Sequence, residues 1–194
     1  MQQQLNAYIL AGGKSSRMGT DKGLLPLQGK PMVQHMAEKL KPLFDKVSIV
    51  SANEAYNNFG CDRIVDIMPG LGPAAGIYTA LAHSDRDYNF ITSCDMPFIS
   101  TAAVEYMLRK ADGAQIILPS HDGQIEPLFG IYSKTCLPKW LALIQRGFLK
   151  LQEMIACFDL LIVDISGNPL FTDPIFQNIN TPDDLNKASI NTNL

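Results

Sequence analysis

Leu10-Ala11-Gly12-Gly13-Lys14-Ser15-Ser16-Arg17-Met18-Gly19-Thr20-Asp21-Lys22 is the stretch that decides the fold, because it joins a predicted strand to a glycine-rich, basic loop. The apolar run at residues 8–11 is typical of a first β-strand. The two adjacent glycines then allow a sharp turn and a close approach to a ligand. Three cations follow: Lys14, Arg17 and Lys22. Free backbone N–H groups beside fixed positive charge suit a polyphosphate, so the loop predicts phosphate binding rather than a solvated turn.

This loop differs from the two commonest phosphate-binding loops. A Walker loop has a Lys-Ser or Lys-Thr pair after its second glycine, at a spacing that is absent here. A dinucleotide-binding loop has three glycines that open a helix, with an acidic residue about twenty positions further on. The prediction of phosphate binding therefore depends on the strand, the glycine pair and the order of the cations.

Strand-like and helix-like patterns alternate along the rest of the chain. We predict strands at 47–51, 63–66, 88–94, 114–118, 127–132 and 160–165, and helices at 31–43, 74–82, 100–110, 134–145 and 150–156, with a last helix starting at Thr181-Pro182-Asp183-Asp184. This alternation predicts an α/β, Rossmann-like fold, with a mostly parallel twisted sheet and helices on both faces. The pair Asp122-Gly123 is typical of a hairpin turn and predicts an antiparallel edge hairpin over 119–132. A single domain is expected over residues 1–194.

The composition is that of a globular enzyme, since 46% of the 194 residues are hydrophobic and 18% are charged. Polar residues interrupt the longest apolar runs, so no membrane span is expected. The N-terminus lacks the basic and apolar segments of a signal peptide. The cysteines show no close pairing, which indicates reduced thiols in a cytoplasmic protein and disfavours a zinc site: Cys61, Cys94, Cys136 and Cys157.

The net charge of −3 is unevenly distributed along the chain. The first 50 residues hold seven Lys or Arg and three Asp or Glu, which gives +4, so the remainder carries −7. A positive field confined to one part of an acidic chain suits a small polyanion better than a nucleic acid, which needs a broad basic face. Nucleic-acid binding is therefore not expected.

Candidate site residues follow several of the predicted strands. Four of them stand at or just after a strand's carboxyl end: Gly12, Asn53, Asp66 and Asp95. Ligands bind at this edge of open parallel sheets. Asp95 ends the apolar run 89–94, where a carboxylate is costly to bury without a partner. Magnesium typically takes one or two carboxylates together with water and phosphate oxygens, so Asp95 is the candidate metal ligand, with a strand-end cap as the alternative.

The stretch Leu10–Lys22 resembles the Leu-Ala-Gly-Gly-x-x-x-Arg-Met-Gly-x-x-Lys motif of the nucleotidyltransferases, and among them that of the molybdenum cofactor guanylyltransferases. Three further segments are similar to motifs of that family: Gly72-Pro73-x-x-Gly76, Cys94-Asp95-Met96-Pro97 and Asn178-Ile179-Asn180-Thr181-Pro182. The resemblance extends from Leu10 to Leu185 and is densest in the first 100 residues.

The resemblance implies roles for individual residues. The nucleotide-binding set that it implies is Leu10, Ala11, Gly12, Gly13, Lys22, Asn53, Asp66, Gly72, Pro73 and Asp95. The implied catalytic groups are Lys22, Arg17 and Asp95, with Mg²⁺ held by Asp95. The implied residues on the pterin side of the pocket are Asn178 and Asn180. Replacement of Asn180 is therefore expected to weaken molybdopterin binding and to leave GTP affinity nearly unchanged.

Some of these assignments have a structural alternative. Asp66 and the two asparagines also suit turns in which side chains satisfy backbone groups. Some family members carry asparagine at the position of Ser51, so Asn53 either takes over that contact or makes a local turn. The three histidines show no ligand spacing and are assigned no role: His35, His83 and His121.

The activity that the resemblance implies is transfer of GMP from GTP to the terminal phosphate of molybdenum-molybdopterin, with release of pyrophosphate. Transient contacts with molybdenum cofactor biosynthesis proteins and molybdoenzyme chaperones are implied as well. The alternative is a related transferase for sugar or cobinamide phosphates, or for cytidylyl transfer to molybdopterin. Gly12 disfavours cytidylyl transfer, since those relatives usually have alanine there. A catalytically silent nucleotide-binding regulator is disfavoured by Lys22 and Asp95.

Overall fold

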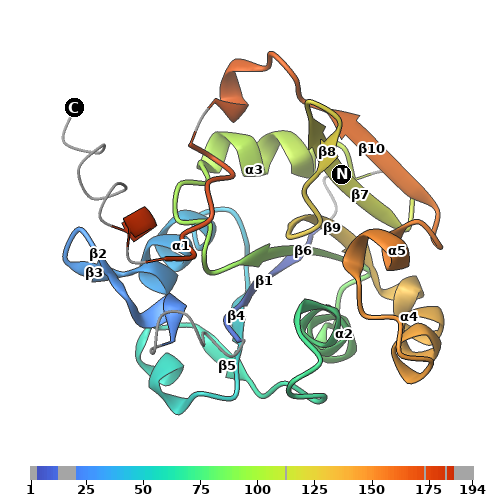
Figure 1. Ribbon diagram of the computed structural model, residues 1–194, viewed down its shortest axis with the longest axis horizontal. Helices are drawn as coiled ribbons and strands as arrows, with labels where there is room; N and C mark the ends of the chain where they lie inside the picture. The colour runs from blue at the N-terminus through green and yellow to red at the C-terminus, as the bar shows by residue number, and fades with distance from the viewer. Residues whose placement is uncertain (1–3, 13–20, 112, 173, 182, 186–194) are drawn as a thin grey trace.

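The computed structural model describes residues 4–12, 21–111, 113–172, 174–181 and 183–185 (Figure 1). Its strands are β1 (Asn6–Leu10), β2 (Pro26–Leu27), β3 (Lys30–Pro31), β4 (Val47–Val50), β5 (Asp62–Ile64), β6 (Tyr88–Ser93), β7 (Ile116–His121), β8 (Gln124–Ile125), β9 (Phe129–Ser133) and β10 (Leu160–Asp164). Its α-helices are α1 (Met32–Leu40), α2 (Pro73–His83), α3 (Thr101–Leu108), α4 (Leu137–Gln145) and α5 (Leu151–Ile155). Short 3₁₀ turns are η1 (Lys22–Leu24), η2 (Glu54–Asn58), η3 (Lys134–Cys136) and η4 (Pro169–Phe171).

The strands form one large sheet and one small hairpin. The eight-stranded sheet has the order β10-β7-β9-β6-β1-β4-β5, with β8 paired to β7, and β2 pairs with β3. The pairs β1–β4, β1–β6, β4–β5 and β10–β7 are parallel. The predicted class, a mostly parallel α/β sheet, is confirmed.

Helices cover both faces of this sheet (Figure 1), and the alternation of side chains along β1 shows how. All five residues of β1 are buried. Ala7 and Ile9 belong to the cluster that packs against α1 and α3. Tyr8 and Leu10 belong to the cluster that packs against α2, α4 and α5. Since successive strand side chains point to opposite faces, a strand covered on both sides is apolar at nearly every position.

The antiparallel part of the sheet lies elsewhere than predicted. Asp122 and Gly123 form the predicted hairpin turn, with φ angles of 48° and 77° that suit a two-residue loop between β7 and β8. The long antiparallel strand β9 nevertheless lies inside the sheet, between β7 and β6, and β10 occupies the edge. The chain passes from β9 through α4 and α5 before β10 adds in parallel to β7. A turn signal in the sequence does not specify on which side a later strand adds.

The carboxyl end of β1 is the point from which the sheet is extended in both directions. Helices α1 and α2 lie on opposite faces, and the strands that follow them, β4 and β6, lie on opposite sides of β1. Such a switch point is where open α/β sheets bind ligands. Backbone hydrogen bonds extend the ladder past the strand ends, from Ala11 N to Val50 O and from Cys94 N to Leu10 O, both at 3.0 Å. The segments that follow β1, β4 and β6 therefore start side by side.

The segment after β10 runs from that edge past α3 to the β2–β3 hairpin (Figure 1). Ile179 is fully buried there and packs with Leu27 and Met32. The predicted start of the last helix is confirmed over residues 183–185. The Thr181 hydroxyl accepts a hydrogen bond from Asp184 N at 3.1 Å, and the Asp184 carboxylate accepts one from Thr181 N at 2.9 Å, which is a reciprocal helix cap. Among the described helices, none has both the length and the apolarity needed to cross a bilayer.

Candidate active site

A cleft of about 310 Å³ opens at the carboxyl ends of β1 and β4. Its lining brings together five residues that were predicted to bind nucleotide: Leu10, Gly12, Asp66, Gly72 and Pro73. Ala11 is fully buried beside the cleft. Gly13 and Arg17, which were predicted to bind phosphate, lie outside the described residues.

Small residues shape the wall of this cleft that faces α2. Gly72 has a φ of 71°, a conformation that favours glycine, and it immediately precedes α2. Pro73 then takes the first position of the helix, where its missing N–H is harmless. A Cβ on Gly76 would lie 3.2 Å from the methyl carbons of Leu10, so glycine allows α2 to approach β1 closely. The wall is therefore small and neutral, which suits the flat ring of a base.

Asp66 forms a turn as well as lining the cleft. Its Oδ1 accepts hydrogen bonds from Met68 N at 3.0 Å and from the hydroxyl of Thr79 at 2.9 Å. Thr79 is fully buried in α2. The structural alternative, a turn-capping carboxylate, is thus present, and the nucleotide contact of Asp66 stays a prediction.

Ser51 and Asn53 take different positions at the end of β4. Ser51 lines the cleft, whereas Asn53 is not among the described residues that do so. The Asn53 side chain accepts a hydrogen bond from Ala55 N at 3.0 Å and so caps η2. Its amide nitrogen donates to Oδ2 of Asp21 at 3.1 Å. Asn53 therefore makes the local turn that was the alternative to a nucleotide contact.

Lys22 lies at the centre of the site, between two groups that are distant in the sequence. Its Nζ is 3.8 Å from Oδ2 of Asp95 and donates a hydrogen bond of 2.5 Å to Oδ1 of Asn180. The side chains of Lys22 and Asp95 are 23% and 20% exposed, so both are reachable from solvent while partly shielded from it. A phosphate placed here meets an ammonium group in a partly desolvated setting, where charge neutralisation is stronger than in water.

The three side chains of the segment from Asn178 to Asn180 lie in different environments. Ile179 is buried, and its N–H donates to the backbone oxygen of Asp95 at 3.0 Å. Asn180 accepts a hydrogen bond from Lys22, whereas Asn178 lines two cavities. Because Asn180 contacts the lysine predicted to bind GTP, the expectation that its replacement leaves GTP affinity unchanged is revised. The assignment of both asparagines to the pterin side stays a prediction.

A second cavity, of about 350 Å³, lies on the other side of Asp95. Asp95, Met96, Glu126 and Asn178 are among its lining residues, with Leu149, which precedes α5, and Leu151, the first residue of that helix. Pro73 lines both this cavity and the cleft beside α2. The two cavities therefore adjoin, with Asp95 beside the second and Lys22 beside Asp95.

Sequence reasoning missed a polar contact that involves Asp21. The buried Tyr56 hydroxyl donates a hydrogen bond to Oδ1 of Asp21. Burial raises the pKa of Tyr56, so its proton stays available for this bond. The signal in the sequence was only an acid inside the basic loop and a tyrosine in a polar segment. Neither predicts the pairing, because 35 residues separate the two.

Asp95 has the chemistry of a ligand for a hard cation that arrives with its substrate. Among the described residues, no group of three or more His, Cys, Asp or Glu could form a closed metal site. A partly exposed carboxylate fits Mg²⁺ that is bound to a triphosphate, since phosphate oxygens and water supply the other ligands. The neighbouring Cys94 thiol does not compete, because burial raises its pKa and keeps it protonated.

A cleft suited to a base shares Pro73 with a second cavity, which is lined by Asp95 of the charged pair with Lys22 and is open to a second substrate. Transfer of a nucleotidyl group requires this division, because the reacting phosphates must lie between the base and the acceptor. The class of protein that the fold and site define is a nucleotidyltransferase.

Comparison with known proteins gives the same class and narrows it. Residues 7–157 match the MobA-like NTP transferase domain, and the chain belongs to this family. The probable molybdenum cofactor guanylyltransferase of Flavobacterium johnsoniae is 36% identical over 190 residues, covering 97% of this chain and 98% of the relative. The molybdenum cofactor guanylyltransferase of Vibrio parahaemolyticus is also 36% identical over 190 residues, covering 94% and 93%.

Solved structures support the same assignment. The crystal structure of molybdopterin-guanine dinucleotide biosynthesis protein A from Archaeoglobus fulgidus has a TM-score of 0.81 to this chain, at 25% identity. The match covers 96% of this chain and 97% of that one.

Proposed function

We propose that this protein transfers GMP from GTP to the terminal phosphate of molybdenum-molybdopterin and releases pyrophosphate. The observation that carries the proposal is that Asp95, paired with Lys22, lines a cavity that shares Pro73 with the cleft beside α2. The names of full-length relatives at 36% identity supply the donor and the acceptor. A single domain over residues 1–194 performs the reaction, and the contact from Asn180 to Lys22 supports this by joining the C-terminal segment to the glycine-rich loop.

The reaction needs no general base from the protein. The acceptor is a phosphate monoester, already anionic near neutral pH. Its oxygen attacks the α-phosphorus of GTP and forms a new P–O bond, while the bond from the α-phosphorus to the bridging oxygen breaks and pyrophosphate leaves. The protein contributes in-line positioning and neutralisation of phosphate charge. Lys22 supplies a point charge for this purpose, and Arg17 supplies a forked donor.

Mg²⁺ is the proposed cofactor, held by the Asp95 carboxylate and the phosphates. Members of this family of nucleotidyltransferases typically use a divalent metal ion. When bound, the ion adds charge neutralisation at the α-phosphate. Asp95 suits Mg²⁺ because hard cations prefer carboxylate oxygens and keep several water or phosphate ligands.

The two cavities are assigned to the two substrates. The cleft beside α2 takes the guanine nucleoside, with Asp66, Gly72 and Pro73 in its wall. The cavity beside Asp95 takes the acceptor, and Asn178 faces it. Contacts with molybdenum cofactor biosynthesis proteins and molybdoenzyme chaperones, in the cytoplasm, follow from the proposed product, which other proteins must receive.

Pyrophosphate release tests the proposal. The purified protein is incubated with Mg²⁺ and each of GTP, ATP, CTP and UTP, with and without molybdenum-molybdopterin. We expect release with GTP only, and only when the acceptor is present. Release with CTP would indicate cytidylyl transfer instead. No release with any nucleotide would favour a nucleotide-binding regulator.

A further inference from the structure

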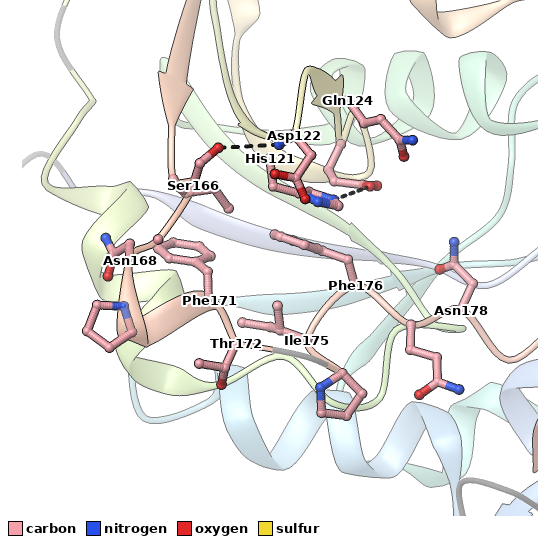
Figure 2. A pocket seen from close by; sticks show the side chains of 16 residues that line it. His121, Asp122, Gln124, Ser166, Asn168, Phe171, Thr172, Ile175, Phe176 and Asn178 are labelled. Carbon is pink, nitrogen blue, oxygen red and sulfur yellow. Dashed lines mark hydrogen bonds and ion pairs between the residues drawn. The ribbon is translucent and has the colours of Figure 1, made fainter.

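A groove of about 1020 Å³ lies beyond the acceptor cavity, between the β7–β8 hairpin and the segment that follows β10 (Figure 2). His121 and Gln124 line it from the hairpin, and Phe176 and Asn178 line it from the other side. Figure 2 shows the side chains of Gln124 and Asn178 on the same side of the stacked rings of His121 and Phe176. The groove combines polar groups with an aromatic floor.

The groove is continuous with the acceptor cavity. Glu126 and Asn178 line both, and the smaller cavity also contains Asp95. A ligand whose phosphate lies near Asp95 therefore extends past Glu126 into the groove. Pockets for small molecules commonly measure about 300–1000 Å³, so the groove has room for a two-ring heterocycle.

The charge of the groove decides which end of the acceptor it fits. Its described lining residues include Asp122 and Glu126, and no Lys or Arg is among them. Such a lining disfavours a phosphate and favours a group that donates hydrogen bonds. A pterin ring has two adjacent donors on one edge, the N3–H and the 2-amino group. A carboxylate accepts both at once, through its two oxygens.

Glu126 is held in place for this contact. Its Oε1 lies 3.1 Å from Nε2 of His121, and its side chain is 21% exposed. The His121 ring stacks on Phe176 with centroids 5.1 Å apart and an interplanar angle of 10°. Phe176 in turn meets the edge of the buried Phe129 at 5.4 Å. The carboxylate is thus tied to the core through two aromatic contacts, which fixes its position before a ligand arrives.

We propose that Glu126 determines acceptor specificity by accepting hydrogen bonds from the N3–H and 2-amino edge of the pterin ring, while the acceptor phosphate lies near Asp95. This inference rests on the proposed function, since a pterin acceptor is part of it. In this scheme Glu126 is a specificity residue that contacts the acceptor. It is not among the described residues that line the GTP cleft.

Direct titration tests the inference without turnover. The probes are 6-hydroxymethylpterin and 6-hydroxymethyllumazine, which differ in that lumazine has a carbonyl in place of the 2-amino group. Their intrinsic fluorescence reports binding to the full-length protein, to Glu126→Gln and to the control Glu105→Gln on α3, an exposed position. We expect the wild type and the control to prefer the pterin by roughly tenfold, the effect of one hydrogen bond to a charged group. Glu126→Gln should lose the preference, because its amide places a donor where the ring also donates.

Steady-state kinetics provide the second readout. Glu126→Gln should raise the KM for molybdenum-molybdopterin by roughly tenfold, with the KM for GTP, kcat and the melting temperature unchanged. Equal binding of the two probes by the wild type would overturn the inference, as would an unchanged preference in Glu126→Gln. Absence of pyrophosphate release from the wild type would instead count against the proposed function, and the two failures are therefore distinguishable.

Discussion

The hydroxyl of Tyr56 donates a hydrogen bond to the carboxylate of Asp21, the residue that immediately precedes Lys22. The other oxygen of that carboxylate accepts from the side chain of Asn53 at 3.1 Å. The backbone of Gly23 also bonds to the Tyr56 hydroxyl, and a side chain at Gly23 would collide with it. Lys22 is therefore fixed on both sides, through Asp21 before it and Gly23 after it.

Removal of the Tyr56 hydroxyl should loosen Lys22 and slow turnover. Tyr56→Phe keeps the buried ring but leaves one oxygen of Asp21 without its donor. We expect kcat to fall by roughly tenfold, the equivalent of about 1.4 kcal/mol, because the ammonium group is less well placed at the reacting phosphates. Steady-state kinetics with GTP and the acceptor measure this.

A matched variant controls for the loss of a tyrosine hydroxyl. Tyr106 is on α3, where its ring meets Phe171 at 5.4 Å. Tyr106→Phe should leave kcat unchanged. If Tyr56→Phe also keeps wild-type kcat and loses only melting temperature, then the contact with Asp21 is purely structural.

Asp95→Asn should preserve the fold and abolish most magnesium-dependent turnover. The amide has the same shape, and the backbone oxygen still accepts from Ile179 N. A neutral amide is a poor ligand for a hard cation, so we expect kcat to fall by about 100-fold or more, as when a key electrostatic group is removed from an active site. Turnover as a function of Mg²⁺ concentration checks this. If turnover by the variant depends on Mg²⁺ as turnover by the wild type does, then Asp95 is only a strand-end cap.

Lys22→Ala should weaken both GTP binding and turnover. A hydrogen bond to a charged group contributes about 1.5–3 kcal/mol, so the expected loss is at least roughly tenfold. Lys30→Ala is the matched control, because Lys30 pairs with Glu38 on the exposed surface, where ion pairs contribute little. Calorimetric titration with GTP compares the two variants. Equal GTP affinities of the two variants would show that Lys22 is only a surface cation.

GTP should stabilise the folded protein by mass action. At about 100 times its Kd the expected gain is about 2.7 kcal/mol. Melting temperatures are measured with GTP, CTP and ATP at equal concentrations in the presence of Mg²⁺. The cleft lined by Asp66 and Gly72 should make GTP the most effective of the three. Equal shifts would contradict the assignment of this cleft to guanine.

The sequence predicted the sheet well because the relevant signals are local. The apolar run before Gly12 and the turn at Asp122-Gly123 each specify a short stretch of backbone, and both are present. The order of strands was less predictable. Whether β10 adds outside β7 depends on where α4 and α5 pack, which no local pattern encodes.

The candidate site likewise has features that the sequence predicts and features that it does not. The positions of Gly12 and Asp95, after β1 and β6, could be predicted because parallel strands end at one edge of the sheet. Their roles in binding stay predictions. Tyr56 donates a hydrogen bond to Asp21, and Glu126 lines both the acceptor cavity and the groove. No sequence pattern around these residues predicts either relationship. Such contacts depend on side-chain packing, so only the folded structure shows them.

Substitutions at Asn178 and Asn180 should have different effects on ligand binding, although the two residues are only two positions apart. The side-chain oxygen of Asn180 accepts a hydrogen bond from Lys22, so Asn180→Ala should weaken GTP and acceptor binding together. Asn178 lines the acceptor cavity and the groove and is not among the described residues that line the GTP cleft. Asn178→Ala should therefore weaken acceptor binding by about fivefold, the effect of one hydrogen bond of about 1 kcal/mol, and leave GTP affinity unchanged. Separate titrations of each ligand against each variant measure this, and melting temperatures control for folding. Loss of GTP affinity in Asn178→Ala equal to that in Asn180→Ala would show that the two positions act as one structural unit.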